Sequence, residues 1–241
     1  MQISVVVPVY NEQENLEPLF ERLVKTLDAL GKTYEIIFVN DGSADKSLEM
    51  LKSFNARRQD VVKVVDFERN CGQHPAIIAG FANASGDLVV TIDAVLQNPP
   101  EEIAKISAEF DRGFDVIGTI RQNRNDTPFR RYASKTVNKI RKVITKVPIT
   151  DQGCMLRGYS KDVAANIVKD AKVSTFIPML AHKFAKNPTE IPVAHAARNA
   201  GESKYNIFSL AKLSFNLFKN GEKTEKETAK PVYAIREKIG F

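Results

Sequence analysis

Polar residues of the kinds that bind nucleotides and cations follow four of the strands that the sequence predicts. In an open parallel sheet, ligands bind at the carboxyl ends of the strands, because those ends meet at one edge. We therefore expect these residues to line a nucleotide crevice. They are Tyr10-Asn11-Glu12 after residues 3–9, Asn40-Asp41-Gly42-Ser43 after residues 34–40, Asn70-Cys71-Gly72-Gln73 after residues 61–67, and Asp93 after residues 88–92.

The elements that must position these residues alternate between short β-branched runs and helical patterns. This alternation is typical of a parallel sheet flanked by helices. The predicted fold class is therefore α/β, with a mostly parallel nucleotide-binding sheet. Further predicted elements are helices over residues 16–30, 45–54, 75–84 and from residue 98 onward, a strand over 116–120, a helix over 129–147, a short strand over 153–157, a helix over 175–184 and an edge strand over 190–193.

Two common nucleotide-binding motifs are missing from the sequence. Pro8-Val-Tyr-Asn-Glu12 follows the first predicted strand, where dinucleotide binding requires Gly-x-Gly-x-x-Gly. The sequence also contains no P-loop. These absences argue against a dinucleotide-dependent dehydrogenase and against a P-loop kinase.

Several motifs, taken in order, resemble those of glycosyltransferase family 2. They are Val6-Val-Pro-Val-Tyr-Asn-Glu12, Val39-Asn-Asp-Gly-Ser43 and Asp93 at its strand end. Further motifs resemble the polyprenyl-phosphate glycosyltransferase branch of that family, so the resemblance implies a GT-A fold over about residues 3–218. These motifs are Gln97-Asn-Pro-Pro-Glu-Glu-Ile103, Gly118-Thr-Ile-Arg-Gln-Asn-Arg124, Gly153-Cys-Met-Leu-Arg157, Ser174-Thr-Phe-Ile-Pro178 and Gly201-Glu-Ser-Lys-Tyr205.

The resemblance also implies which residues of the crevice bind the donor. Asp93, with Gln97, would hold the Mg²⁺ or Mn²⁺ ion that bridges the diphosphate. Hard oxygen ligands suit such a cation, which would neutralise the leaving nucleoside diphosphate. The residues that would hold the base and ribose are Pro8, Tyr10, Glu12 and Asp41, with Gln73 beside them.

The reaction implied by the resemblance is transfer of a sugar, with inversion, from a nucleotide sugar, expected to be UDP-linked, to a polyprenyl phosphate. The acceptor is a phosphate monoester that is largely ionised at neutral pH, because its second pKa is about 6. Such an acceptor needs cations rather than a strong general base. Asp93, Arg121 and Arg131 are the expected catalytic residues, and Arg198 and Lys204 are expected to help bind the anionic groups.

The chain departs from the family at its metal motif. The family has Asp-x-Asp, whereas this sequence has Asp93-Ala-Val95. Loss of even an outer partner of a metal ligand typically costs roughly 10–100-fold in metal affinity or activity. Three readings remain open: weak metal binding, function with Asp93 and Gln97 alone, or an inactive variant.

The C-terminal region departs from the branch as well. Its members usually carry a hydrophobic transmembrane hairpin and then a short cytoplasmic tail, and residues 230–241 resemble that tail. The charged segment 220–228 stands where the hairpin would be, so we expect the membrane segments to have been excised. The predicted organisation is a GT-A domain over residues 1–219, followed by a charged linker and tail over residues 220–241.

Charge and composition constrain the partners and the location. The net charge of +6 suits an anionic partner. The predicted helix 129–147 has a basic face, which is either solvated or in contact with an anionic membrane surface. Two cysteines without metal-type spacing fit a reducing cytosol. The resemblance implies a protein that serves synthesis of the cell envelope and its lipopolysaccharide, and we expect it to be cytoplasmic and peripheral at the inner face of the cell membrane.

Two alternative functions compete with the transferase. One is a non-catalytic protein of the same fold that binds a nucleotide sugar or a lipid phosphate, and it is motivated by Val95 and by the missing hairpin. The other is a nucleic-acid binder, motivated by the basic charge. We expect no nucleic acid as partner, because the polar motifs converge on one crevice and no basic platform with interleaved aromatic residues is present.

Overall fold

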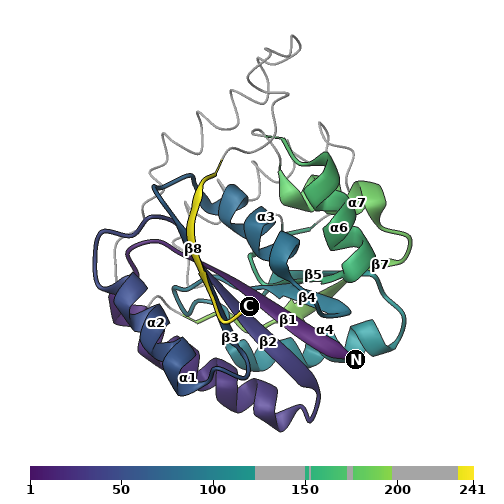
Figure 1. Ribbon diagram of the computed structural model, residues 1–241. Coiled ribbons are helices and arrows are strands. Elements are labelled where there is room, and N and C mark those ends of the chain that lie inside the picture. Colours follow the sequence, from purple (N-terminus) through teal and green to yellow (C-terminus); the bar gives the residue numbers. More distant parts are fainter. Residues whose placement is uncertain (123–149, 152, 173–175, 197–232) are drawn as a thin grey trace, which may run out of the picture.

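The structure is a computed structural model that describes residues 1–122, 150–151, 153–172, 176–196 and 233–241. Within these ranges, eight strands form one sheet in the order β7-β5-β6-β4-β1-β2-β3-β8 (Figure 1). The strands are β1 (Gln2–Val9), β2 (Thr33–Asn40), β3 (Val62–Phe67), β4 (Leu88–Thr91), β5 (Val116–Arg121), β6 (Arg157–Ser160), β7 (Pro188–Val193) and β8 (Ile235–Ile239).

The sheet is mostly parallel, as the sequence predicts. Strand β1 pairs in parallel with β2 and β4, β2 with β3, and β5 with β7. Strand β6 runs antiparallel to β4 and β5, and β8 runs antiparallel to β3. The carboxyl ends of six strands and the amino ends of β6 and β8 therefore meet at the same edge.

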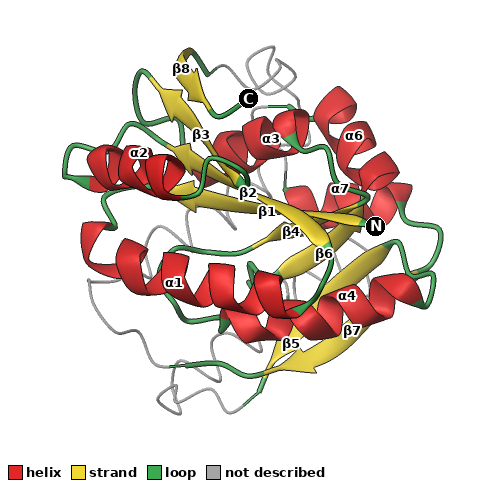
Figure 2. Cartoon of the chain, turned by 60° about the horizontal axis from the view of Figure 1, so that its bottom comes forward, coloured by secondary structure: helices red, strands yellow, loops and turns green. Residues whose placement is uncertain are grey.

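Helices cover both faces of the sheet and produce a three-layer α/β/α arrangement (Figures 1 and 2). One layer contains α1, α2 and α4, and the other contains α3, α6 and α7. The helices are α1 (Gln13–Ala29), α2 (Ser47–Arg57), α3 (Gln73–Asn83), the short 3₁₀ helix η1 (Pro100–Glu102), α4 (Ile103–Asp111), α6 (Lys161–Asp170) and α7 (Ile177–Phe184).

The two layers follow from the alternation of side chains along the buried strands. Val5 and Val7 of β1 pack with Leu16 and Leu23 of α1 on one face. Val6, between them, packs with residues of α3 and α6 on the other face. Successive side chains of a strand point to opposite faces, so a strand covered on both faces must be apolar throughout.

The first half of the chain confirms the predicted elements to within a few residues at their ends. The predicted strand over 153–157 is wrong, because pairing with β4 begins only at Arg157. The sequence interpretation also missed α6 and β8. The predicted helix 129–147 lies outside the described residues, as does the predicted domain boundary between residues 219 and 220.

Candidate functional site

The loops after β1 and β2 are joined by hydrogen bonds at the carboxyl edge of the sheet. The Asn11 backbone N–H donates to Ser43 Oγ over 3.0 Å, and the Asn11 side-chain oxygen accepts from the Ala44 backbone over 2.8 Å. The Glu12 backbone N–H donates to Ser47 Oγ over 3.0 Å. These bonds hold the two loops in one fixed relation, so the polar residues at the two strand ends lie side by side.

Asp41 fastens the loop after β3 to the loop after β2. Its Oδ1 accepts from the Cys71 backbone N–H over 2.6 Å, and its Oδ2 accepts from the Gly72 backbone N–H and Asn70 Nδ2, each over 2.9 Å. Burial raises the pKa of Asp41, and the backbone donors offset only part of that rise. Asp41 therefore fixes the position of residues 70–72 at the carboxyl edge of the sheet.

Gly42 permits the close approach of these two loops. Its φ is +65°, a conformation that residues other than glycine rarely adopt. A Cβ atom at this position would lie 2.4 Å from the backbone of Arg69. The turn that the sequence predicts at Asp41-Gly42-Ser43 is thus also the surface on which the 69–72 segment rests.

The remaining residues expected to bind the nucleotide lie along the same edge. Tyr10, just after β1, is 37% exposed, whereas Pro8 is buried within β1. Glu12 is half-buried, and its Oε2 accepts from Asn15 Nδ2 over 2.8 Å. Gln73 is the first residue of α3 and is half-buried. The structure brings these four residues to one edge, and their contact with a nucleotide stays a prediction.

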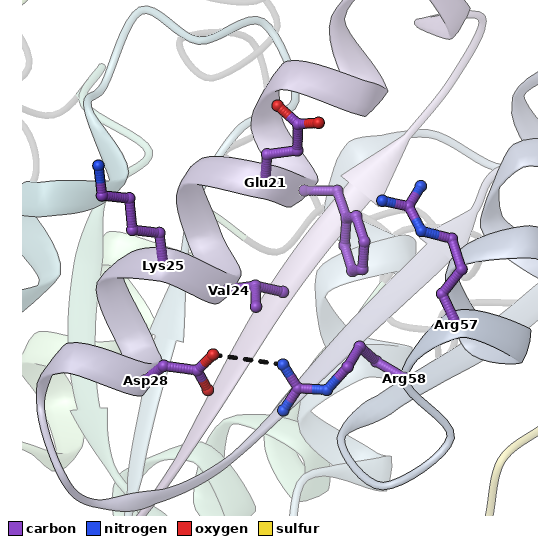
Figure 3. Close-up of a pocket in the computed structure, with 7 residues that line it drawn as sticks. Glu21, Val24, Lys25, Asp28, Arg57 and Arg58 are labelled. Atoms are coloured by element: carbon purple, nitrogen blue, oxygen red, sulfur yellow. Dashed lines mark hydrogen bonds and ion pairs between the residues drawn. The ribbon is translucent and has the colours of Figure 1, made fainter.

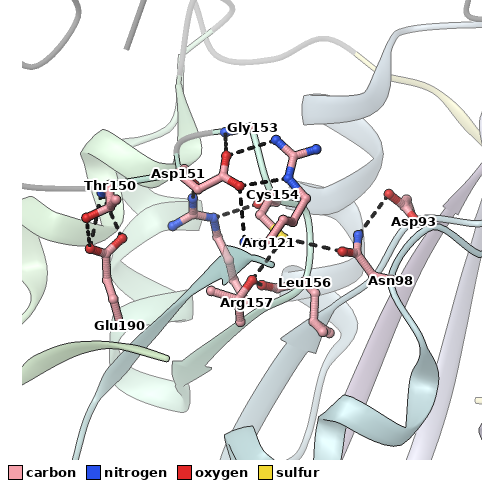
Figure 4. A network of polar contacts seen from close by, with 11 residues as sticks. Asp93, Asn98, Arg121, Thr150, Asp151, Gly153, Cys154, Leu156, Arg157 and Glu190 are labelled. Carbon is pink, nitrogen blue, oxygen red and sulfur yellow. Dashed lines mark hydrogen bonds and ion pairs between the residues drawn. The ribbon is translucent and has the colours of Figure 1, made fainter. Parts of the chain in front are cut away.

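Asp93 is oriented by a chain of buried polar groups (Figure 4). Asn98 Nδ2 donates to Asp93 Oδ2 over 3.1 Å, and Cys154 Sγ donates to Asn98 Oδ1 over 3.4 Å. Burial raises the pKa of the Cys154 thiol, so it keeps its proton at neutral pH. The Thr119 hydroxyl lies 2.9 Å from this sulfur. This series of hydrogen bonds fixes which atoms of the Asn98 amide face Asp93.

Arg121 forms a two-pronged ion pair with Asp151 and also interacts electrostatically with Asp93 (Figure 4). Its Nε and Nη2 donate to Asp151 over 2.7 and 2.9 Å. Burial opposes the charge of Arg121, but the hydrogen bonds and charge of Asp151 and the charge of Asp93 raise the pKa of the guanidinium above its ordinary value. Arg121 is therefore a permanently charged cation with a fixed orientation.

Asp151 was not singled out by the sequence analysis, although it lies just before the motif at residues 153–157. Glu190 of β7 accepts from the backbone and hydroxyl of Thr150, and Arg157 Nη2 donates to the Asp151 carbonyl over 2.5 Å. Arg157 is only 3% exposed. The motif residue Arg157 thus holds the loop that carries Asp151, and that carboxylate in turn orients Arg121.

The described part of the chain contains no group of three His, Cys, Asp or Glu side chains arranged to hold a metal ion. Asp93 is the carboxylate at the end of β4, and Val95, two residues later, is half-buried and offers no ligand atom. Gln97 is half-buried, and its backbone carbonyl accepts from the Ala196 backbone N–H over 2.9 Å. One carboxylate and one amide suit Mg²⁺ or Mn²⁺ only when diphosphate oxygens complete the shell.

Three expected site residues lie outside the described residues: Arg131, Arg198 and Lys204. Among the helices that can be described, none is long and apolar enough to cross a bilayer.

A shallow groove between α1 and α2 lies away from the carboxyl edge (Figure 3). Its charged side chains are largely occupied: Arg57 pairs with Glu17, and Arg58 pairs with Asp28 and Asp60. Arg57 also lies over the ring of Phe20, 4.9 Å from its centroid. Nothing in this groove indicates a ligand.

Solved structures of other proteins share the fold of this chain. A solved structure of glucosyl-3-phosphoglycerate synthase from Mycobacterium tuberculosis, in complex with Mn²⁺, uridine diphosphate and phosphoglyceric acid, superposes with a TM-score of 0.65 at 16% identity. The match covers 90% of this chain and 76% of that one. A complex of the same enzyme with Mg²⁺ and uridine diphosphate gives a TM-score of 0.64. At this identity the similarity establishes the fold alone, which is GT-A-like.

Similarity in sequence is much closer to another group of enzymes. The chain is 48% identical over 215 residues to the undecaprenyl-phosphate 4-deoxy-4-formamido-L-arabinose transferase of Edwardsiella ictaluri. The aligned region covers 89% of this chain and 66% of that protein. The enzyme of the same name from Salmonella paratyphi B is 46% identical over 216 residues. The chain thus spans about two thirds of the length of these relatives. The resemblance carried by the sequence motifs is confirmed.

The family itself is recognised over most of the chain. Residues 4–168 match the family described as Glycosyl transferase family 2. This range contains both loops joined by Asp41 and the Asp93–Arg121–Asp151 cluster. The chain therefore belongs to glycosyl transferase family 2.

Proposed function

We propose that the chain is a glycosyltransferase that moves a sugar from a UDP-linked donor to a polyprenyl phosphate with inversion. The observation that carries the proposal is the convergence of Asp41, Asp93 and Arg121 on one edge of the sheet, at the ends of β2, β4 and β5. This edge is where nucleotides bind in open α/β sheets. The names of the relatives make undecaprenyl phosphate and 4-deoxy-4-formamido-L-arabinose the first acceptor and sugar to test.

The nucleotide would lie across the joined loops. Tyr10 is exposed just after β1, and residues 70–72 are fixed by Asp41. We propose that both contact the nucleotide. Pro8, Glu12 and Gln73 complete the proposed base and ribose site. Because Asp41 already accepts three hydrogen bonds, its effect on the nucleotide would pass through the loop that it holds.

Asp93 and Gln97 would be the protein ligands of a divalent cation that binds with the donor. When bound, Mg²⁺ or Mn²⁺ would stabilise the negative charge of the leaving nucleoside diphosphate. Val95 cannot ligate it, so we propose a weakened cation site. Asn98 would hold the Asp93 carboxylate in its orientation toward the donor.

Arg121 would draw the anionic acceptor toward the donor. The phosphate oxygen attacks the sugar carbon opposite the leaving diphosphate, which inverts the configuration at that carbon. An ionised phosphate needs no base, so the requirement is a fixed cation that offsets repulsion between two anions. Arg121, oriented by Asp151, meets that requirement, and we propose Arg131, Arg198 and Lys204 as further cations of this site.

Contact with the membrane would bring the chain to its lipid acceptor. We propose peripheral attachment at the inner face of the cell membrane through the basic residues of 129–147. Attraction of Lys and Arg to anionic lipids is about 1 kcal/mol per charge near the surface and is screened by salt. The fraction of the chain that cosediments with anionic vesicles should fall at high salt. If the chain binds neutral vesicles as well as it binds anionic vesicles, this attachment is refuted.

A second candidate function is binding of the nucleotide sugar without catalysis, and Val95 is the observation that favours it. Isothermal titration with UDP, with and without Mg²⁺ or Mn²⁺, tests the shared nucleotide site. UDP release in the presence of donor and undecaprenyl phosphate then separates the enzyme from the binding protein. Absence of UDP binding would refute both functions.

A further inference from the structure

The C-terminal strand contacts the chain immediately before the loop that Asp41 holds. The ring of Tyr233 stacks on that of Phe67 with 4.9 Å between centroids and 11° between planes. The Glu68 backbone N–H donates to the Ala234 carbonyl, and Arg236 Nη2 donates to the Glu68 carbonyl, each over 3.0 Å. Both backbone groups of Glu68 are therefore bonded to the tail.

Arg236 is connected to the loop after β2 by a second route. Its Nη1 lies 3.5 Å from Asp66 Oδ2, and Asp66 is only 1% exposed. Asp66 Oδ1 accepts from Asn40 Nδ2 over 2.7 Å. Asn40 Oδ1 accepts from the Ser43 backbone over 3.3 Å. The guanidinium thus lies at the end of a polar chain that leads to the turn beside Asp41.

The segment that these contacts hold has no regular secondary structure. Residues 68–72 belong to no helix or strand, and they cross from the end of β3 to the start of α3. Asp41 holds the segment at residues 70–72, and the tail holds it at Glu68. Fixing the backbone of one residue costs roughly 1–2 kcal/mol in entropy, so a loop ordered beforehand leaves less to be ordered when a ligand binds.

We propose that Tyr233 and Arg236 are positioning residues of the nucleotide site. The C-terminal strand keeps residues 68–72 in the conformation in which Asp41 and the loop form one wall of the crevice. This inference rests on the proposed function, because it assigns the crevice to a nucleotide.

A purely structural role makes a different prediction. Strand β8 also covers the edge of β3, and an uncovered edge invites pairing with other chains. Any residue of β8 that fastens the strand to a neighbouring element would serve that role equally. Lys238 is such a residue, since its Nζ donates over 2.7 Å to Asn83, at the far end of α3 from residues 68–72. Lys238→Ala and Arg236→Ala each remove one positive charge from the same strand, so they form a matched pair.

The thiol of Cys71 can serve as a probe of the order of residues 68–72. This thiol is partly exposed within residues 68–72, whereas Cys154 is 1% exposed. Alkylation of the folded protein with iodoacetamide, followed by peptide mass spectrometry, therefore reports the order of the loop separately from nucleotide binding.

The experiment measures UDP affinity by isothermal titration and the rate of Cys71 alkylation for the wild type, Tyr233→Ala, Tyr233→Phe, Arg236→Ala and Lys238→Ala. Residues that act through others typically change a coupled affinity by roughly 2- to 30-fold. Tyr233→Ala and Arg236→Ala should weaken UDP binding within that range and speed alkylation of Cys71. Tyr233→Phe keeps the stacked ring and should match the wild type, as should Lys238→Ala.

Three other outcomes would contradict either the proposed function or this inference. Lack of UDP binding by the wild type overturns the proposed function, and the inference falls with it. Wild-type binding that Tyr233→Ala and Arg236→Ala leave unchanged overturns the inference alone. Equal losses in Arg236→Ala and Lys238→Ala assign β8 to the structural role and likewise overturn the inference. Thermal unfolding of each variant shows whether it is folded at the temperature of the titration.

Discussion

Asn98 donates its side-chain N–H to Asp93 over 3.1 Å, and it does so from a position that is 2% exposed. Behind it, Cys154 donates to the same amide. In this chain the carboxylate at the end of β4 is therefore aligned by a neutral amide and a protonated thiol, while the position two residues after it is occupied by Val95. The cation chemistry of the site depends on that arrangement.

Replacing Val95 by Asp should restore cation dependence to nucleotide binding. In the wild type, Mn²⁺ should raise UDP affinity only slightly, because one carboxylate and one amide hold the ion weakly. Val95→Asp supplies a second carboxylate, and Mn²⁺ should then raise the affinity by about tenfold or more, the scale on which metal-site partners act. Isothermal titration measures this gain, with Val95→Asn as the uncharged control. A large Mn²⁺ effect in the wild type would contradict the weakened site.

Asn98→Leu should reduce the increase in UDP affinity that Mn²⁺ causes in the Val95→Asp variant. Leu has a similar size but cannot donate to Asp93, so the carboxylate loses its alignment. In the Val95→Asp background, Asn98→Leu should lower the Mn²⁺-dependent gain in UDP affinity by roughly tenfold, as expected for the loss of a partner of a metal ligand. The affinity without Mn²⁺ should change little. Cys154→Ser, which keeps a donor, should retain most of the gain. An equal loss with and without Mn²⁺ would indicate general damage.

Arg121→Lys should separate nucleotide binding from sugar transfer. Lys keeps the charge but cannot offer the two parallel donors that Asp151 receives from Arg121. UDP affinity should stay within about twofold, whereas kcat/KM for the polyprenyl phosphate should fall at least about tenfold, the cost of a lost charge-assisted bond. UDP release in the Val95→Asp background measures the effect. A change confined to UDP affinity would place Arg121 with the nucleotide instead.

The stability of the chain should depend on pH through Glu35. Burial opposes its ionisation, but Lys63, Ser4 and Ser85 outweigh that effect and lower the pKa of Glu35. A lowered pKa in the folded state means that the stabilisation is present above the unfolded value of about 4.3 and is lost as the pH falls through the folded value.

Glu35→Gln should therefore lower the free energy of unfolding at pH 7 by about 1–3 kcal/mol, as for other buried charged hydrogen bonds. The difference from the wild type should shrink as the pH falls below 4. Glu17→Gln, which breaks the exposed pair with Arg57, is the control and should cost no more than about 1 kcal/mol. Urea unfolding at several pH values measures both. A difference that is constant with pH would refute the role of the Glu35 charge.

Much of the fold and part of the site could be predicted from the sequence, for physical reasons that differ by element. The strands β1 to β4 are apolar runs bounded by turn residues, so their pattern is local. Strand β8 has the sequence Ile-Arg-Glu-Lys-Ile, and it is specified by its partner β3, which lies far away in the sequence. A short charged edge strand carries no local signal of its own.

The same distinction applies to the site. Asp41 and Asp93 follow predictable strands, so their position at the edge could be predicted. Asp151 and Asn98 act through contacts with Arg121 and Asp93, and only the packing of β5, β6 and β4 shows those contacts. The strand placed at 153–157 was wrong because residues 153–156 form a loop before β6. Arg157, the first residue of β6, binds this loop through the carbonyls of Asp151 and Cys154.

The most direct test of the account is the affinity for UDP of the wild type, Asp41→Ala and Asp45→Ala, measured by isothermal titration. Asp45 is the matched control, because it also accepts from backbone N–H groups, those of Ser47 and Gln13, but does not contact residues 70–72. The account predicts that the wild type binds UDP, that Asp41→Ala weakens binding by at least about tenfold, since a charge-assisted hydrogen bond contributes roughly 1.5–3 kcal/mol, and that Asp45→Ala has little effect. Absence of binding by the wild type, or an affinity that Asp41→Ala leaves unchanged, would contradict it.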